Sequence, residues 1–259
     1  MRLKENNIYN MDCLEGLEKL EDNSVDLVVT SPPYNVDLGN NKYNKNPYNL
    51  YNDNKEHEEY LSWMKEIFSK VYQKLKSGGR VCINIGDGKN GAVPTHSDII
   101  QFMTEDIGYI PMATIIWDKS QVGNRTAWGS WKSPSSPSFP TPFEFILVFA
   151  KESKKLKSKG ETDLTSEEFK EWAYGIWKFT PETRQKKIGH PAMFPEELPK
   201  RCIKMFSWKD ALVVDIFSGA GTTCKVAKEL GRRYIGFEIS KEYCDIANKR
   251  LEELEEEVS

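Results

Sequence analysis

The run Ser31-Pro32-Pro33-Tyr34 places a hydroxyl, two prolines and an aromatic ring directly after the apolar segment 25–29. Consecutive prolines fix φ and lack N–H donors, so the carbonyl groups around Ser31 and Pro32 tend to face outward and stay free to accept hydrogen bonds. The Ser31 hydroxyl adds a further acceptor, and the Tyr34 ring can stack on a planar heterocycle. These four residues suit an exocyclic NH2 group on a base, and they are the candidate catalytic residues.

A second polar turn stands late in the chain, where Ser218-Gly219-Ala220-Gly221-Thr222-Thr223 follows the apolar run 211–217. A helical pattern over 224–230 comes next, and then a buried-strand pattern over 234–237 that ends at Glu238. This order predicts a strand, a glycine turn, a helix and a second strand, which together make a βαβ unit.

The residues around this glycine turn favour S-adenosylmethionine as the ligand. A dinucleotide-binding fingerprint would need a third glycine where Cys224 stands, and Asp215 would face a pyrophosphate with negative charge. Asp215 suits the ammonium and sulfonium of S-adenosylmethionine better, and Glu238 can accept hydrogen bonds from a ribose diol. The structural alternative is a tight turn beside two surface acids.

Strands alternate with helices in both halves of the chain, which predicts an α/β fold with a doubly wound, mostly parallel sheet. Ligands of such sheets bind beyond the carboxyl ends of the strands, so we expect the two turns to meet at one edge. In the N-terminal half the expected elements are strands at 7–11, 25–29 and 81–85 and helices at 14–20 and 60–75, the second one stopped by Gly78-Gly79.

In the middle of the chain the alternation fails, and serine, proline and charged residues replace it. Only 143–150 has a strand pattern there, and it is expected to pair with 114–117. The predicted division is a Rossmann-like core at 1–117 and 190–259 with strand 143–150 added to its sheet, an irregular target-recognition insertion at 118–189, and a mobile loop at 35–54.

The composition is that of an ordinary globular protein of 259 residues, 39% of them hydrophobic, with a net charge of −3. No apolar run approaches the ~20 residues of a membrane helix and no secretory signal opens the chain, so a cytoplasmic protein is expected. Five scattered cysteines argue for reduced core thiols and against disulfides, and no zinc or other metal site is expected. Basic residues cluster at 151–159 and 178–187, and these clusters could contact the phosphates of a nucleic acid although the net charge is negative.

Taken together, the motifs resemble those of the β group of amino-directed DNA methyltransferases, which belong to restriction-modification systems. The catalytic motif Ser31-Pro32-Pro33-Tyr34 comes early and the cofactor motif Asp215-x-Phe217-x-Gly219-x-Gly221 comes late, a permutation of the usual methyltransferase order. Further matching segments, which extend the likeness over nearly all of the chain outside the loops, are 10–14, 78–81, 116–119, 143–151 and 190–195.

The resemblance implies a role for many single residues. Asp12 would meet the adenine amino group of S-adenosylmethionine, Glu238 would bind the ribose, and 190–194 with 217–223 would enclose the methionine. The expected cofactor-binding residues are Asp12, Cys13, Asp215, Phe217, Ser218, Gly219, Gly221, Thr222, Thr223, Glu238, His190, Pro191, Ala192 and Phe194. The expected DNA-binding residues are Arg125, Lys132, Arg184 and Lys187, while Trp128 and Trp131 are expected to buttress loops.

The resemblance further implies methyl transfer to a base nitrogen, and Ser31 favours cytosine N4, because enzymes acting on adenine mostly have Asp or Asn at this position. If Ser31 Oγ and the Pro32 carbonyl accept the two N–H protons, the amine can pyramidalise and attack the methyl group in line. In double-stranded DNA the target base must first be flipped out, and Tyr34 is the expected stacking partner. A restriction endonuclease for the same site is the expected protein partner.

Other functions compete with this prediction. Adenine N6 methylation keeps the fold and changes the acceptor, and RNA or protein acceptors are further variants. A nucleic-acid-binding module without chemistry and a nicotinamide-dependent oxidoreductase are the alternatives from other classes. Carbon-5 cytosine methylation would need a cysteine nucleophile, typically after a proline, and the chain has no Pro-Cys dipeptide.

Overall fold

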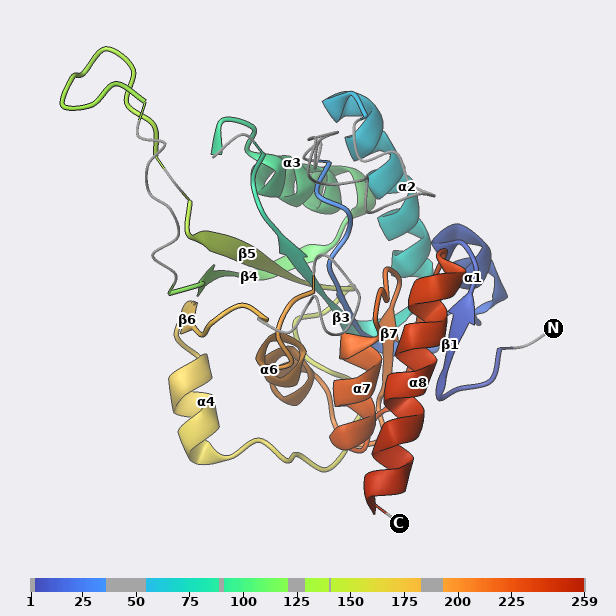
Figure 1. The fold of residues 1–259 in the computed structure, drawn as a ribbon. Coiled ribbons are helices and arrows are strands. Elements are labelled where there is room, and N and C mark those ends of the chain that lie inside the picture. The colour runs from blue at the N-terminus through green and yellow to red at the C-terminus, as the bar shows by residue number, and fades with distance from the viewer. Residues whose placement is uncertain are drawn as a thin grey trace.

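The computed structural model of this chain describes residues 3–35, 55–88, 91–120, 129–139, 141–182 and 193–258. Its strands form one eight-stranded sheet in the order β1-β8-β7-β2-β3-β5-β4-β6, which lies in the middle of the molecule (Figure 1). The strands are β1 (Asn7–Asn10), β2 (Val25–Thr30), β3 (Leu75–Ile85), β4 (Ile110–Asp118), β5 (Phe143–Ala150), β6 (Ile176–Lys178), β7 (Leu212–Asp215) and β8 (Arg233–Glu238).

The predicted α/β class with a mostly parallel sheet is confirmed. Strand β5 runs antiparallel to both of its neighbours, β3 and β4, and every other pairing in the sheet is parallel. The chain passes from β2 to β3 in one direction along the sheet and from β7 to β8 in the other. The neighbouring strands β2 and β7 therefore flank the point where the strand order reverses, which is where ligands bind in open α/β sheets.

Helices cover both faces of the sheet and make a three-layer fold. Alternate residues of β2 serve the two layers: Val28 packs in one hydrophobic core and its neighbours Leu27 and Val29 in the other. The helices α1 (Cys13–Lys19), α2 (His57–Lys74) and α3 (Thr95–Gln101) and the π-helix η2 (Phe102–Ile107) pack on the first face. The helices α4 (Ser166–Trp172), α6 (Glu197–Phe206), α7 (Thr222–Glu229) and α8 (Lys241–Val258) pack on the second.

Local signals fix several of these helix ends. Asp12 caps α1 by accepting hydrogen bonds from the backbone N–H groups of the next turn, and Thr165 with Glu168 forms a capping box at α4. Gly221 precedes α7 at φ +76°, a left-handed conformation that is strained for a residue with a Cβ. A Cβ added at this position would also lie only 2.8 Å from the Cβ of Ala247. The glycine turn of the sequence is thus a backbone requirement of this fold.

The structure corrects the predicted end of α2. The helix ends at Lys74, and strand β3 begins at the next residue and runs through Gly78 and Gly79. The register of β2 against β3 shifts between Val25 and Leu27, so the glycines lie at an irregular start of the strand rather than at a helix stop.

The middle of the chain also holds more regular structure than predicted. The expected pairing of 143–150 with 114–117 is confirmed as part of the β4–β5 ladder. Within 151–182, however, helix α4 contacts α6, and β6 adds to the edge of the core sheet beside β4. The three residues of β6 are too few for a clear periodic pattern. The start of α4 does carry a sequence signal, the capping box Thr165-x-x-Glu168, which the prediction of an irregular insertion overlooked.

The five cysteines are free and buried, as predicted. In the part of the chain that the structure describes, no helix is long and apolar enough to cross a membrane. The same residues contain no group of three His, Cys, Asp or Glu side chains that could hold a metal ion. The predicted mobile loop lies outside the described residues except for Asn35.

Candidate active site

The two special turns meet at one edge of the sheet, as the sequence predicts. Strands β2 and β7 are neighbours, and the turns that follow them carry Ser31 and Gly219. A buried hydrogen bond of 2.7 Å joins the turns, because Thr30 Oγ1 donates to Asp215 Oδ1. The same carboxylate oxygen accepts the N–H of Phe217 at 3.1 Å. Asp215 therefore ties the start of one turn to the start of the other.

Asp215 does not face the open edge in this structure, because its side chain is only 1% exposed. Burial raises the pKa of its carboxyl group from 3.8 to about 6, and the negative charge of Glu238 adds to this effect. Hydrogen bonds from Thr30, Thr223 and the Phe217 backbone act in the opposite direction. The position suits a residue that fixes the two turns, whereas the sequence analysis assigned Asp215 to a cationic ligand.

Two acids stand at the ends of the neighbouring strands β1 and β8. Asn10 and Glu238 are partners in the parallel ladder, and Asp12 follows two residues later. The Glu238 carboxylate accepts the N–H of Gly219 at 2.8 Å and that of Ser240 at 2.7 Å, and burial raises its pKa. Asp12 caps α1 through Oδ1. A carboxylate at each strand end beside a glycine turn matches the donor groups of a nucleoside with an exocyclic amine and a ribose.

Several candidate cofactor residues of the turn after β7 point into the protein. Ser218 Oγ lies 3.7 Å from the Cys224 sulfur. The Thr223 hydroxyl has one proton to donate, either to Asp215 or to the Val29 carbonyl, which lies 3.3 Å from its Oγ1. Thr222 Oγ1 accepts from Arg250 at 3.3 Å. These hydroxyls hold the turn in shape, and only the backbone of the turn is left to line a ligand.

The remaining described candidates are apolar or buried. The Phe217 ring packs against Trp63 with ring centroids 5.6 Å apart, and Phe194 is half-buried against the hydrophobic core of the second face. Burial, with the nearby charge of Asp12, raises the pKa of the Cys13 thiol to about 12, so this thiol is an inert core group. His190, Pro191 and Ala192 lie outside the described residues.

The turn after β2 holds the catalytic candidates. Ser31 Oγ donates to the backbone carbonyl of Asn84 at 3.2 Å or to the Tyr34 hydroxyl at 3.3 Å. Pro32 is buried, and the carbonyl of Pro33 accepts the Tyr60 hydroxyl at 2.9 Å. The Pro33 carbonyl therefore faces inward, while the outward direction expected for the Ser31 and Pro32 carbonyls stays a prediction.

Sequence reasoning missed three polar residues of this region, Asn84, Lys119 and Glu144. The Tyr34 hydroxyl donates to Glu144 Oε2 at 2.9 Å, and the Asn84 amide donates to the same oxygen at 2.7 Å. Lys119 contacts the other carboxylate oxygen. Glu144 is the one charged residue in the otherwise apolar strand 143–150, and this isolated carboxylate is the signal that could have identified it.

Of the candidate DNA-binding residues, only Lys132 is described; Arg125, Arg184 and Lys187 fall outside the described residues. Lys132 lies in the segment 129–139, which projects from the body of the protein beside β4 and β5 (Figure 1). Its ammonium stands 5.7 Å from the centre of the Trp131 ring, and Trp131 is 64% exposed. The expectation that Trp131 buttresses a loop stays a prediction, and Trp128 lies outside the described residues.

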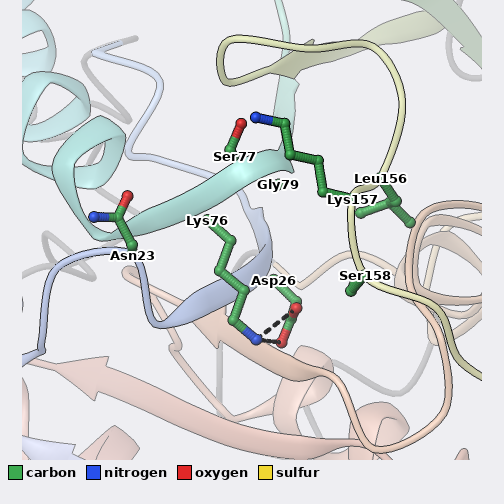
Figure 2. Close-up of a pocket in the computed structure, with 8 residues that line it drawn as sticks. All are labelled: Asn23, Asp26, Lys76, Ser77, Gly79, Leu156, Lys157 and Ser158. Atoms are coloured by element: carbon green, nitrogen blue, oxygen red, sulfur yellow. Dashed lines mark hydrogen bonds and ion pairs between the residues drawn. The ribbon is translucent and has the colours of Figure 1, made fainter.

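A cavity of about 280 Å³ lies at the opposite edge of the sheet, at the amino ends of β2 and β3 (Figure 2). Lys76 crosses it to pair with Asp26 at 2.8 Å. The lining residues are Asn23, Asp26, Lys76, Ser77, Gly79, Leu156, Lys157 and Ser158. The cavity contains none of the candidate residues, so it is separate from the site at the carboxyl ends of the strands.

Known proteins share both the sequence and the fold of this chain. A family model described as DNA methylase matches residues 25–249. The Type II methyltransferase M.MjaVI of Methanocaldococcus jannaschii is 43% identical over 169 residues, which cover 64% of this chain and 82% of that protein. M.MjaI from the same organism is 34% identical over 266 residues and covers 91% of this chain and 88% of its own length.

Solved structures of DNA methyltransferases share the fold of this chain. TTHA0409, a putative DNA modification methylase of Thermus thermophilus solved with S-adenosyl-L-methionine, has a TM-score of 0.74 and 28% identity, with 95% of this chain and 93% of that chain covered. PvuII DNA methyltransferase (cytosine-N4-specific) shares the fold with a TM-score of 0.70 at 23% identity, over 96% of this chain and 87% of that one.

A family match over most of the chain, a relative aligned over nearly its full length, and two acids beside a glycine turn agree with one another. The chain belongs to the DNA methylase family, as a DNA methyltransferase of the restriction-modification type that uses S-adenosylmethionine as its cofactor.

Proposed function

We propose that this enzyme methylates N4 of cytosine in double-stranded DNA and that Ser31 and Pro32 accept the protons of the target amine. The observation that carries the proposal is the direction of the Ser31 hydrogen bond. Its single proton is taken by the Asn84 carbonyl or the Tyr34 hydroxyl, both within the protein. The Ser31 lone pairs are left to accept an N–H from a base.

These acceptors correct the weakness of a cytosine amine as a nucleophile. Its lone pair is delocalised into the ring, and hydrogen bonds to both N–H groups favour a pyramidal nitrogen with a localised lone pair. S-adenosylmethionine supplies the methyl group on an activated sulfonium. With the acceptors at the end of β2 and the cofactor turn at the end of β7, the fold holds the two partners next to each other, and proximity contributes much of the rate.

The cofactor is proposed to lie along the turn after β7. Asp12 and Glu238 would hold the adenine amine and the ribose, because they end the neighbouring strands β1 and β8. Gly219 and Gly221 keep side chains out of the turn, and their backbone would line the methionine part of the cofactor. Asp215, Ser218, Thr222 and Thr223 would act from beneath by holding the shape of this turn.

Tyr34 is the proposed stacking partner of the flipped base. Flipping costs a few kcal/mol, and a flat ring beside the acceptors recovers part of that cost. The segment 118–189 is the proposed target-recognition region, with Arg125, Lys132, Arg184 and Lys187 as its DNA contacts. Because the relatives are named Type II methyltransferases, we further propose a cognate restriction endonuclease that acts on the same site.

Replacing Lys132 by glutamine should weaken binding to DNA of any sequence and reduce the slope of log affinity against log salt by about one. The physical reason is the loss of one cation that neutralises a phosphate. Fluorescence anisotropy with a labelled duplex over a series of salt concentrations measures this slope. Lys249→Gln is the control that should keep the wild-type slope, because Lys249 is exposed on α8, which contacts β1 and β8 at the other end of the strand order. Equal slopes for wild type and Lys132→Gln would remove Lys132 from the interface.

Mass spectrometry of nucleosides tests the proposed acceptor. DNA from a methylation-deficient bacterial host that expresses this protein should contain N4-methylcytosine. N6-methyladenine in its place would keep the fold and the cofactor and make the enzyme an adenine methyltransferase, which is the second candidate because the family description covers DNA methylation without naming a base. Absence of both products from cells that hold folded protein would contradict the proposed activity.

A further inference from the structure

A polar cluster lies behind the Ser31-Pro32-Pro33-Tyr34 turn and is made by four residues from separate parts of the chain: Tyr34, Asn84, Lys119 and Glu144. Asn84 is 1% exposed and the Glu144 side chain 12% exposed. The register of β3 against β5 explains the meeting, because Ile85 pairs with Phe145 and so brings Asn84 and Glu144 to the same end of the ladder. The cluster touches the proposed catalytic turn from the protein side.

Glu144 can only accept hydrogen bonds in this arrangement. One of its oxygens contacts Lys119, and the other receives an N–H of the Asn84 amide. An ammonium and an amide nitrogen have no lone pair to offer, so both carboxylate oxygens must be acceptors. The orientation of the Asn84 amide agrees, because its Oδ1 is buried without a partner among the described residues while its Nδ2 is turned to Glu144. A buried oxygen without a hydrogen bond costs free energy, and the charge-assisted hydrogen bond from Asn84 Nδ2 to the Glu144 carboxylate offsets that cost.

This fixed acceptor sets the direction of the next hydrogen bonds. The Tyr34 hydroxyl must give its proton to Glu144 Oε2, so its oxygen is left as an acceptor toward Ser31 and Asn84. Ser31 consequently donates inward, to Tyr34 or to the Asn84 carbonyl, and cannot receive a proton from Tyr34. Among the described residues no hydrogen bond is then given to Ser31 Oγ, so its lone pairs are left for the target amine.

We propose that Glu144 is a positioning residue for methyl transfer, which acts through Tyr34 and keeps Ser31 Oγ as an acceptor for the target amine. The inference rests on the proposed function of Ser31. Close packing supports it, since a Cβ added to Gly86 would lie 3.2 Å from the Tyr34 ring and 3.4 Å from Glu144 Cγ. The backbone thus holds both side chains in place.

Glu144→Gln tests the direction of the hydrogen bonds between Ser31, Tyr34 and Glu144, because the substitution changes the donors and acceptors but hardly the shape of the side chain. The amide would keep its oxygen toward Lys119 and turn its N–H2 toward Tyr34 and Asn84, and the Asn84 amide would then turn its unpartnered Oδ1 to this new donor. Tyr34 would lose the carboxylate that takes its proton and would be able to donate to Ser31, occupying one of the Ser31 lone pairs. We expect kcat to fall by about 10-fold to 100-fold. The dissociation constants for S-adenosylmethionine and for duplex DNA should remain within about twofold, because Glu144 would touch neither.

The double variant Ser31→Ala with Glu144→Gln decides whether Glu144 acts through Ser31. If it does, the second substitution adds no further loss of kcat to that of Ser31→Ala. Multiplying losses, or a Glu144→Gln enzyme with wild-type kcat, would overturn the inference. A thermal unfolding curve for each variant distinguishes the positioning role of Glu144 from a merely structural one. If the role were structural, the substitution would lower the melting temperature and raise both dissociation constants. Failure of the proposed function is distinguishable, because the wild-type enzyme would then give no methylated cytosine.

Discussion

Replacing Ser31 by alanine should lower kcat about 10²-fold to 10³-fold, the range seen when one preorganised hydrogen-bonding group is removed from an active site. The Ser31 oxygen is one of only two acceptors proposed for the target amine, and without it the nitrogen keeps its lone pair in the ring. Single-turnover methylation of a duplex oligonucleotide measures the effect. The affinity for S-adenosylmethionine, measured by calorimetry, should remain close to the wild-type value, since the cofactor turn follows β7 and not β2.

The control for this change is Ser69→Ala. Ser69 also carries a hydroxyl that donates within the protein, but it bonds to Lys65 inside α2, so its loss should leave kcat unchanged. A Ser31→Ala enzyme with kcat within about threefold of the wild type would contradict the mechanism. A loss of cofactor affinity equal to the loss of kcat would instead assign Ser31 to cofactor binding.

Much of the fold could be predicted because its signals are local. The apolar runs at 25–29 and 211–217 and the turns that end them predicted two strands with loops at a common edge, and the structure places β2 beside β7. The missed strand β6 has three residues, and its place beside β4 depends on tertiary packing. Propensity carries little information for an element of that length.

The candidate site was predictable only where its residues follow one another in the sequence. Ser31 to Tyr34 form one turn, whereas Glu144 lies 110 residues after Tyr34 and reaches it through the antiparallel pairing of β3 with β5. No local pattern encodes such a register. Asp215 shows a second limit of local patterns, because its place beside the glycine turn predicts contact with a ligand, whereas its carboxylate accepts a buried hydrogen bond from Thr30.

The inward position of Asp215 makes the stability of the protein depend on pH. The folded-state pKa of about 6 lies above the ordinary value of 3.8, since burial disfavours the charged carboxylate. A raised folded-state pKa contributes stability that is fully present below the unfolded pKa and is lost as the pH rises through the folded pKa. The contribution amounts to about 3 kcal/mol, because each pKa unit corresponds to about 1.4 kcal/mol.

Asp215→Asn should remove this dependence. Asparagine does not titrate and can still accept from Thr30 and from the Phe217 N–H through its side-chain oxygen. Relative to the wild type, the free energy of unfolding of the variant should therefore rise by about 3 kcal/mol between about pH 3 and about pH 8. Urea unfolding curves of both proteins at several pH values measure the difference. A difference that stays constant across this range would show that the carboxyl group is solvated.

Asp163→Asn is the matched control, because Asp163 titrates in another pH window. Partial burial opposes its charge, but the hydrogen bonds and charge of Arg232 prevail and lower its pKa below 3.8. Its contribution to stability is present above that value and is lost only as the pH falls through the lowered pKa, so the difference from wild type should stay flat from about pH 5 to about pH 8.

The affinity of Asp215→Asn for S-adenosylmethionine separates the two interpretations of Asp215 itself. A buried tie between the turns predicts a large change in the pH profile of unfolding and a small change in affinity. Direct contact with the cofactor ammonium predicts a large loss of affinity and a wild-type profile.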